Sequence, residues 1–349
     1  MTSKYLIPLF SIVAISVAGC GGTGGSSGGA RKEIRVVGSS TVFPFAQIVA
    51  EKLSKDGKFT SPVIESTGTG NGIKLFCAGV GATFPDVVNA SRRFKKSEYE
   101  TCASKGIKDI VEIQIGLDGV AFAEANNSEL KLKLSPVDVY KAVAANPFGK
   151  PNTTKNWSDV NPALPNVPIL IYGPASTSGT RDALAELILT KGCDSDPAMK
   201  ALKDSDKDKH KSICTRVRED SAYVNVTDNY NLIVSKISAN PKAIGIFGYE
   251  FLEANTDKIR GITMDGVAPT YENIASFSYP GARPLYFYVK SAHLTSIKGL
   301  KEFSGGFVEN WGPDGLFKQR GLVVAPEDVR AANAKIVEAM TPLDPTTLK

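Results

Sequence analysis

The stretch Ile110–Ala123 reads IVEIQIGLDGVAFA and decides the fold of this chain. It is strongly apolar and longer than an ordinary strand of about five or six residues, so it predicts a strand that leaves one domain and enters another. A second apolar run at Arg283–Val289, RPLYFYV, predicts the strand that returns. Crossings near residues 116 and 284 predict two lobes joined by a hinge.

Strand and helix signals alternate on both sides of the crossing run, which is the pattern of α/β domains with mostly parallel sheets. Ile34–Val37 predicts a strand, and the next segment predicts a helix whose apolar face holds Phe45, Ile48, Val49 and Leu53. We therefore expect an α/β fold of two hinged lobes with mostly parallel sheets. The first lobe would span 33–117 and 285–349, and the second 118–284.

Three polar turns each join a predicted strand to a predicted helix: Gly38–Thr41, Thr67–Gly72 and Ser176–Thr180. Gly, Ser and Thr leave backbone N–H groups open, their hydroxyls add neutral donors, and the following helix directs its positive dipole end to the turn. In open α/β sheets, ligands lie at these carboxyl ends of strands. The turns predict a site for a small oxyanion, while the missing P-loop and dinucleotide spacings disfavour nucleotides.

The N-terminus is typical of an exported chain. Lys4 precedes an apolar stretch, Leu6–Ala18, that is too short to span a bilayer comfortably. Small residues before Cys20 are similar to a bacterial lipobox, so we expect a signal peptide over 1–19 and a lipid on Cys20; an ordinary signal peptide cut elsewhere is the alternative. The Gly/Ser-rich segment within 20–32 predicts a flexible tether. The expected location is the periplasm or the bacterial cell surface, with membrane association through the lipid.

Charge and cysteine content narrow the class further. The chain has 41 basic and 36 acidic residues, a mild net charge of +5 without the basic stripe of a nucleic-acid-binding protein. The Lys/Asp mixture over 200–211 predicts a solvated loop.

Beyond Cys20, four cysteines remain in an exported chain, and local pairing predicts the disulfides Cys77–Cys102 and Cys193–Cys214 among three possible connectivities. The two histidines, His210 and His293, lie far apart in sequence, so no metal site is predicted.

Several motifs occur together in the order seen in one known family: GSSTV at 38–42, TGTGNG at 67–72, NASR at 89–92, SGT at 178–180 and GIFGY at 245–249. Over nearly all of the mature chain, the sequence resembles the PstS-type phosphate-binding proteins, the extracytoplasmic receptors of phosphate ABC importers. The resemblance implies a type II periplasmic binding fold, with the anion buried between two lobes.

The resemblance also implies which residues bind the anion. The first turn would supply the Thr41 hydroxyl and the Val42 N–H, with Ser40 adjacent. The second would supply the Thr69 hydroxyl, and the third Ser178, Gly179 and Thr180.

Two positions depart from the family pattern. Arg92 stands where many members have an aspartate that accepts the proton of hydrogen phosphate, and Pro174 stands where members often have an arginine. A cation would then come from Arg92, Arg181 or Arg218, since the planar guanidinium fork suits tetrahedral oxyanions. Each has a structural alternative: a surface salt bridge for Arg92, a structural role for Arg181, and an ion pair with Glu219 or Asp220 for Arg218. Spacing does not choose among the candidate proton acceptors Asp118, Glu65 and Asp220.

The expected function is a monomeric receptor without catalysis or cofactor that delivers inorganic phosphate to the membrane subunits of an ABC importer. Three alternatives stay open. The chain could bind another tetrahedral oxyanion such as sulfate, it could be a secreted phosphomonoesterase with a Ser or Thr nucleophile, or it could be an adhesin or scaffold that merely keeps this fold.

Overall fold

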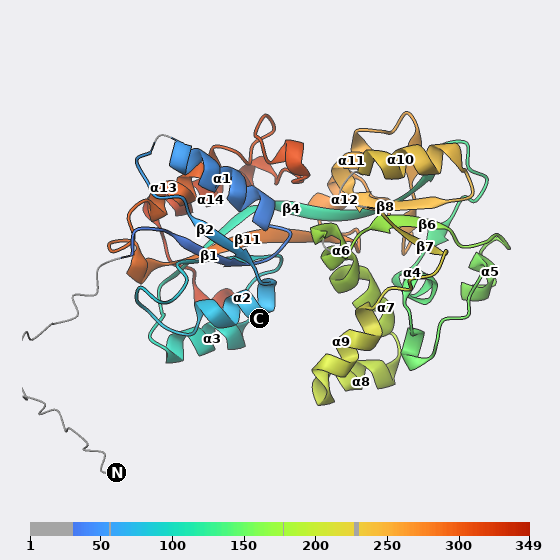
Figure 1. The fold of residues 1–349 in the computed structure, drawn as a ribbon, viewed down its shortest axis with the longest axis horizontal. Helices are drawn as coiled ribbons and strands as arrows, with labels where there is room; N and C mark the ends of the chain where they lie inside the picture. Colours follow the sequence, from blue (N-terminus) through green and yellow to red (C-terminus); the bar gives the residue numbers. More distant parts are fainter. Residues whose placement is uncertain (1–30, 56, 177, 227–229) are drawn as a thin grey trace, which may run out of the picture.

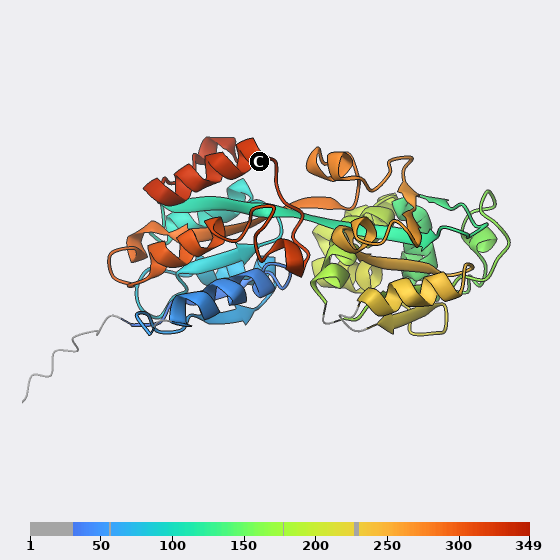
Figure 2. The ribbon, with the colours of Figure 1, turned by 90° about the horizontal axis from the view of Figure 1, so that it is seen from above.

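The computed structural model describes residues 31–55, 57–176, 178–226 and 230–349. The predicted signal peptide, Cys20, nearly all of the tether and Thr177 of the third turn lie outside these residues. Two bodies lie side by side, and β4 (Ile110–Ala125) and β11 (Ala282–Lys290) run between them (Figure 1). The strand predicted over Ile110–Ala123 is thus one continuous strand, β4. Seen from above (Figure 2), β4 passes from the body that carries α1 (Phe43–Lys55) into the body that carries α10 (Tyr230–Ala239).

A nine-stranded sheet has the strand order β2 (Val63–Ser66), β1 (Arg35–Gly38), β3 (Val87–Ala90), β11, β4, β8 (Ile244–Gly248), β6 (Ile171–Pro174) and β7 (Tyr223–Val226), with β9 (Ile259–Gly261) also paired to β4. β5 (Lys133–Leu134) and β10 (Thr263–Met264) form a separate parallel pair. In the first lobe, β1 pairs in parallel with β2 and β3; in the second, β6 pairs in parallel with β7 and β8. The crossing strands β4 and β11 pair antiparallel because the chain returns in the opposite direction. The predicted two-lobe α/β fold is confirmed. The sheet combines parallel strands in each lobe with antiparallel strands where β4 and β11 run between the lobes.

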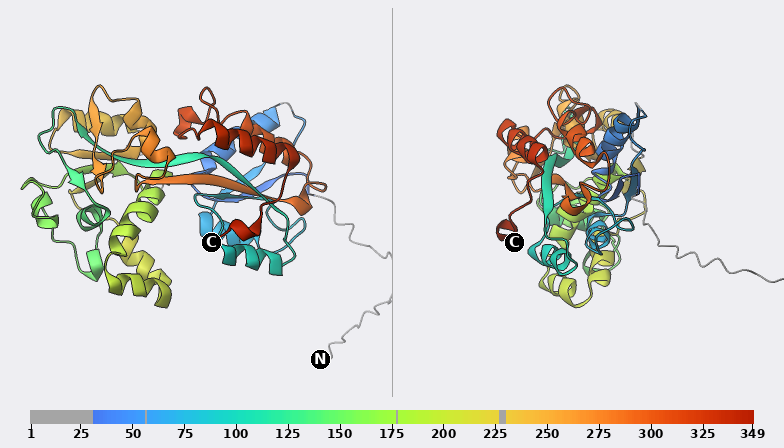
Figure 3. Two further views of the ribbon diagram at one scale, coloured as in Figure 1. Left: turned by 180° about the vertical axis from the view of Figure 1, so that it is seen from behind. Right: turned by 90° about the vertical axis from the view of Figure 1, so that its left-hand side faces the viewer.

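Helices cover both faces of the first lobe's sheet (Figure 3). They are α1 (Phe43–Lys55), α2 (Thr69–Phe76), α3 (Lys96–Ser104), α13 (Leu300–Val308) and α14 (Glu327–Ala339), with short turns η3 (Ser291–His293), η4 (Lys318–Arg320) and η5 (Pro345–Thr347). One face packs Phe287 of β11 against Phe307 of α13, with ring centroids 4.3 Å apart. On the other face, Tyr288 packs 4.1 Å from Phe94, which in turn lies edge-on to Phe76 of α2. The apolar side chains on alternate sides of β11 thereby anchor two layers of helices.

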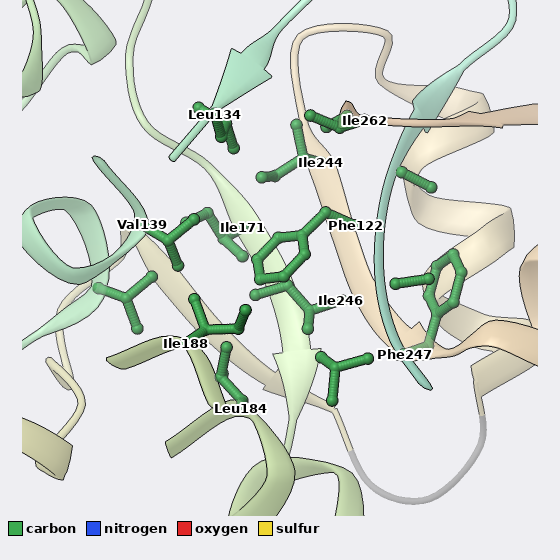
Figure 4. Close-up of a cluster of buried hydrophobic side chains, with 14 of the residues drawn as sticks. Phe122, Leu134, Val139, Ile171, Leu184, Ile188, Ile244, Ile246, Phe247 and Ile262 are labelled. Carbon is green, nitrogen blue, oxygen red and sulfur yellow. The ribbon is translucent and has the colours of Figure 1, made fainter. Parts of the chain in front are cut away.

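The second lobe has its own apolar core around Phe122 of β4 (Figure 4). Ile171 and Ile246, from neighbouring strands, gather there with Leu184 and Ile188. The helices around it are α4 (Pro136–Val143), η1 (Pro147–Gly149), α5 (Trp157–Val160), α6 (Gly179–Ala183), the π-helical η2 (Leu184–Leu189), α7 (Thr190–Cys193), α8 (Pro197–Ser205), α9 (Lys207–Thr215), α10 (Tyr230–Ala239), α11 (Tyr249–Glu253) and α12 (Tyr271–Ala275). Within the described ranges, no helix is long and apolar enough to cross a bilayer.

The prediction of a solvated loop over 200–211 is wrong, because the segment forms most of α8 and α9. Asp196 caps α8 by accepting from the N–H groups of Ala198 and Met199, and Asp206 caps α9 by accepting from Lys209 N–H. The charged side chains of α8 and α9 remain largely exposed to solvent, so this charge-rich segment is solvated although it is helical.

Both predicted disulfides are confirmed. Cys77–Cys102 joins the end of α2 to α3, and Cys193–Cys214 joins α7 to α9. Cys193, Cys214 and His210 lie within 4.8 Å of one another, but the two sulfurs are bonded to each other and supply no thiolate to a metal. His210 instead forms a 2.7 Å hydrogen bond with Asp194.

Candidate functional site

The first polar turn is fixed by a close approach between two strands. Gly38, at the end of β1, has a φ of +125°, and a Cβ there would lie 2.1 Å from the carbonyl oxygen of Asn89 on β3. Only glycine fits this position. Ser39 N–H donates to the same Asn89 oxygen at 2.9 Å, which places Ser40 and Thr41 at the carboxyl end of the sheet.

The first and third turns meet across the two lobes. The Thr41 hydroxyl donates to the carbonyl oxygen of Gly179 at 3.3 Å, and the Ser40 hydroxyl donates to the carboxylate of Asp182. A Cβ on Gly179 would lie only 2.8 Å from Thr41 Cα. The predicted site residues Ser40, Thr41 and Gly179 therefore come together, and the lobes are in direct contact here.

The second turn lies beside the end of β3. Thr69 is buried, and its hydroxyl oxygen accepts from Ser91 N–H at 3.0 Å and lies 2.9 Å from Ser91 Oγ. The Ser91 hydroxyl lies 3.5 Å from Oε2 of Glu186, which belongs to η2 of the other lobe. Neither Ser91 nor Glu186 was predicted from the sequence as a site residue.

The hydroxyls of the third turn are linked through a tyrosine. Ser178 N-caps α6, and its Oγ lies 2.7 Å from the phenol oxygen of Tyr230. Tyr230 in turn donates to Thr180 Oγ1 at 2.7 Å.

Val42 of the first turn differs from these residues because its side chain is buried in the first lobe's core, so only its backbone is suited to ligand contact.

Arg283 joins the turns at the centre of the site. It is buried on β11, and its three guanidinium nitrogens each have a different partner. Nε donates to Asp118 on β4 at 2.9 Å, one terminal nitrogen donates to Glu186 at 2.5 Å, and the other donates to Thr41 Oγ1 at 2.9 Å. One guanidinium thus links a first-lobe hydroxyl, the crossing strands and a second-lobe carboxylate.

The three arginines nominated from the sequence pair with groups in their own lobes in this structure, whereas Arg283 contacts Thr41 of the first turn. Arg92 pairs with Glu98 through two hydrogen bonds of 2.9 and 2.7 Å, and this pairing raises the pKa of Arg92. Arg181 donates to the Pro174 carbonyl at 2.7 Å and lies over the ring of Tyr223. In each case a group in the same lobe satisfies the guanidinium.

Arg218, the third, is buried and forms a fork with the half-exposed Asp220, with a shortest distance of 2.6 Å. This is the ion pair considered as its structural alternative, and it lowers the pKa of Asp220. Arg218 therefore holds Asp220 away from the three turns.

Glu65, another candidate proton acceptor, lies on the edge strand β2. Its side chain is 49% exposed and lies 3.6 Å from Arg35. Of the three candidate proton acceptors, only Asp118 lies in the cluster around Arg283.

Residues 23–307 match the family described as the PBP superfamily domain. A phosphate-binding protein PstS from Staphylococcus saprophyticus is 30% identical over 329 residues, which cover 91% of this chain and 90% of the relative. The chain belongs to the family of PstS-type phosphate-binding proteins. The resemblance inferred from the turns is thus confirmed over almost the whole length.

Three further proteins resemble this chain in sequence or in fold. Protein SphX from Synechococcus elongatus is 30% identical over 83% of this chain and 76% of its own length. The crystal structure of a possible phosphate-binding protein from Planctomyces limnophilus superposes with a TM-score of 0.72 at 26% identity, covering 88% of this chain and 98% of that one. PstS from Borrelia burgdorferi, at 18% identity and a TM-score of 0.56 over 85% of this chain and all of that one, shares the fold.

Proposed function

We propose that this chain is an extracytoplasmic receptor that binds inorganic phosphate between its lobes and delivers it to an ABC importer. The observation that carries the proposal is the position of Arg283, whose guanidinium bonds the Thr41 hydroxyl while facing the second lobe. A cation surrounded by hydroxyls and backbone N–H groups from both lobes is suited to a tetrahedral oxyanion. Family membership supports the same ligand.

The anion would replace hydrogen bonds that the site now makes within itself. Thr41, the Val42 N–H and Ser40 would bind it from the first turn, and Thr69 from the second. The third turn would add Ser178, Gly179 and Thr180. Neutral donors in a site that excludes water hold an anion strongly, because their dipoles are already oriented.

Phosphate entry requires the lobes to separate, since Thr41 and Gly179 now lie in contact. We place the hinge where β4 and β11 cross, between residues 117 and 118 and between 284 and 285. The pairing of β4 with β11 shifts register between Leu285 and Tyr286, an irregularity that suits bending. The closed form would then be the one that the permease recognises.

The N-terminal features complete the proposal. A signal peptide over 1–19, a lipid on Cys20 and a tether over 20–32 would hold a monomeric receptor at the membrane that carries the permease. Cys20→Ser would release the protein into the soluble extracytoplasmic fraction, while retention in the membrane fraction would contradict lipid anchoring.

Titration calorimetry of the mature protein with phosphate, arsenate and sulfate tests the function. We expect phosphate and arsenate to bind with a Kd on the order of micromolar or tighter, and sulfate to bind far more weakly. Preference for sulfate would favour the alternative oxyanion receptor. Release of product from a chromogenic phosphate ester would contradict a receptor without catalysis, and binding of no oxyanion would favour a scaffold.

A further inference from the structure

We propose that Glu250 takes up a proton when the lobes close and releases it when they open, so that phosphate binding and proton binding to this receptor favour one another. This inference rests on the proposed function. Glu250 lies in α11 and is not a member of the three turns proposed to bind the anion. Three features support the proposal: the position of Glu250 between the lobes, the missing partner of its buried oxygen, and the charges around it.

Glu250 borders a cavity of about 260 Å³ whose walls belong to different lobes. On one side, Tyr249 and Leu252 anchor α11 in the core of the second lobe. On the other side, Lys318 of η4 follows Phe317, which is buried in the core of the first lobe. A movement of one lobe relative to the other therefore changes the surroundings of Glu250.

The backbone beside this cavity passes from one lobe to the other. Leu322 packs in the first lobe's core and Val323 in the second's, and Val323 pairs with Leu117 of β4 through two backbone hydrogen bonds of 2.9 and 3.1 Å. A neighbouring cavity of about 670 Å³ shares Glu250 and Lys318 with the first. Opening of the lobes would draw η4 away from α11 and admit water to the carboxyl group of Glu250.

The carboxyl group of Glu250 is incompletely paired while the lobes are in contact. Its Oε1 is buried and has no hydrogen-bond partner within the described residues. The cations that line the cavity are directed elsewhere: Arg330 Nε donates to the Ala325 carbonyl at 3.1 Å, and Lys318 is exposed to solvent. Burying an ionised carboxylate without a partner costs far more than burying a neutral carboxyl group. This arrangement of the lobes therefore favours a protonated Glu250.

The charges around Glu250 favour the same form. The titratable and charged residues that face it are Asp118 of β4, Tyr249 and Glu253 of α11, Tyr271 of α12, Lys318 of η4, and Glu327 and Arg330 of α14. Burial raises the pKa of Glu250 well above its ordinary value, Asp118 and Glu253 raise it further, and Lys318 lowers it by less. Tyr249 donates to Glu253 at 3.1 Å and Tyr271 donates to the Val324 carbonyl at 3.0 Å, so both hydroxyl protons are used elsewhere.

The two arrangements of the lobes therefore differ in how tightly they hold this proton. With the lobes open, a hydrated Glu250 has an ordinary pKa of about 4.3 and is ionised at pH 6. With the lobes closed, the carboxyl group is buried and protonated. Since phosphate binds between closed lobes, binding takes up a proton at this pH. By linkage, the phosphate Kd then rises as the pH rises toward the raised pKa of the closed form.

Calorimetry with phosphate at pH 6, in buffers of different ionisation enthalpy, counts the protons taken up on binding. Protons that belong to the phosphate itself are common to wild type and variant, so the difference between the two isolates Glu250. We expect wild type to take up about one proton more per phosphate than Glu250→Gln, whose amide stays neutral in both arrangements. Between pH 5.5 and 6.5, the ratio of the wild-type Kd to the Glu250→Gln Kd should rise about fivefold or more.

Glu327→Gln is the matched control, because Glu327 lines the same cavity but is exposed to solvent. Its proton count should equal that of wild type. Lys318→Gln gives a second test in which the altered side chain is exposed. Loss of the ammonium group removes the influence that lowers the pKa of Glu250, so proton uptake should extend to higher pH than in wild type.

The outcomes separate this inference from the function on which it rests. If wild type binds phosphate and takes up the same number of protons as a folded Glu250→Gln, the role of Glu250 is overturned and the receptor function stands. If circular dichroism shows that Glu250→Gln does not fold, identical pH profiles of proton uptake in Lys318→Gln and wild type overturn that role instead. If wild type binds no phosphate, the proposed function is overturned and this inference with it.

Discussion

Arg283 and Asp118 lie directly opposite one another on β11 and β4, and Arg283 Nε donates to Asp118 Oδ2 at 2.9 Å. Both strands run between the lobes at this position, so the ion pair lies at the proposed hinge. The remaining two guanidinium nitrogens reach one group in each lobe, Thr41 and Glu186. This geometry makes the hinge itself part of the proposed binding site.

Replacing Arg283 should therefore weaken phosphate binding strongly. Arg283→Gln removes the guanidinium that would donate to the anion, and we expect the Kd for phosphate to rise on the order of 100-fold, equivalent to about 3 kcal/mol. Calorimetry measures the change. The matched control is Arg93→Gln, whose guanidinium pairs with Glu112 at 2.8 Å and touches none of the three turns. A rise in the phosphate Kd of less than threefold for Arg283→Gln would show that Arg283 does not bind the anion.

Adding a methyl group at Gly179 should oppose closure of the lobes. In Gly179→Ala, the new Cβ would lie 2.8 Å from Thr41 Cα, a backbone atom that cannot swing away. We expect the phosphate Kd to rise about tenfold or more, equivalent to about 1.4 kcal/mol or more, and small-angle scattering to report a larger radius of gyration. Gly305→Ala, where a Cβ meets nothing within 4 Å, is the control. Equal phosphate affinity in both variants would show that close approach at Gly179 is not needed for binding.

Loss of a disulfide should reduce stability and leave binding largely intact. Cys77–Cys102 and Cys193–Cys214 join residues separated by 25 and 21 positions, and loops of this size contribute about 3 kcal/mol each in the chain-entropy model. Replacing either pair by serines should lower the free energy of unfolding by roughly that amount, measured by urea denaturation. Both bridges lie outside the three turns. An unchanged denaturation midpoint would contradict their stabilising role.

Glu250 should make stability depend on pH. Its Oε1 is buried, has no hydrogen-bond partner within the described residues, and borders a cavity of about 260 Å³ between α11 and the segment 313–330. Burial raises the pKa of Glu250 well above its ordinary value, and the carboxylates of Asp118 and Glu253 raise it further. The folded state therefore holds this proton more tightly than the unfolded state. Its contribution to stability is full below the ordinary glutamate pKa and is lost as pH rises toward the raised pKa.

Glu250→Gln removes this dependence. We expect the Tm of the variant, relative to wild type, to be about 2 °C or more higher at pH 8 than at pH 5, the size of shift that ~1 kcal/mol produces. Glu100→Gln, at an exposed position on α3, serves as the control. If the Tm of Glu250→Gln differs from that of wild type by the same amount at pH 5 and at pH 8, the raised pKa of Glu250 is contradicted.

Local patterns in the sequence were sufficient to predict the parts of the fold and site that depend on local chemistry. Glycine, serine and threonine after an apolar run indicate a turn at the end of a strand, so the three turns could be nominated. The family resemblance then singled out Thr41, Thr69 and Ser178 within them. The long apolar run identified β4, and close spacing of the cysteines identified both disulfides.

Arg283 and Glu186 could not be found in this way. Arg283 reads as a polar residue at the start of an apolar strand, and its partner Asp118 is 165 positions away. Glu186 occupies the polar side of an amphipathic helical segment, and such a side looks the same in sequence whether it faces solvent or another lobe. The helices of 197–215 were missed because Lys and Asp dominate their sequence and hide the few apolar positions, such as Met199 and Ile213, that pack on the lobe's core. Capping by Asp196 and Asp206 supports both helices.

A crystal structure grown in excess phosphate tests the central claim most directly. We predict a tetrahedral anion between the lobes, within hydrogen-bonding distance of Arg283 and of hydroxyls from both lobes. An anion bound elsewhere, or turns that face apart with only solvent between them, would contradict the account.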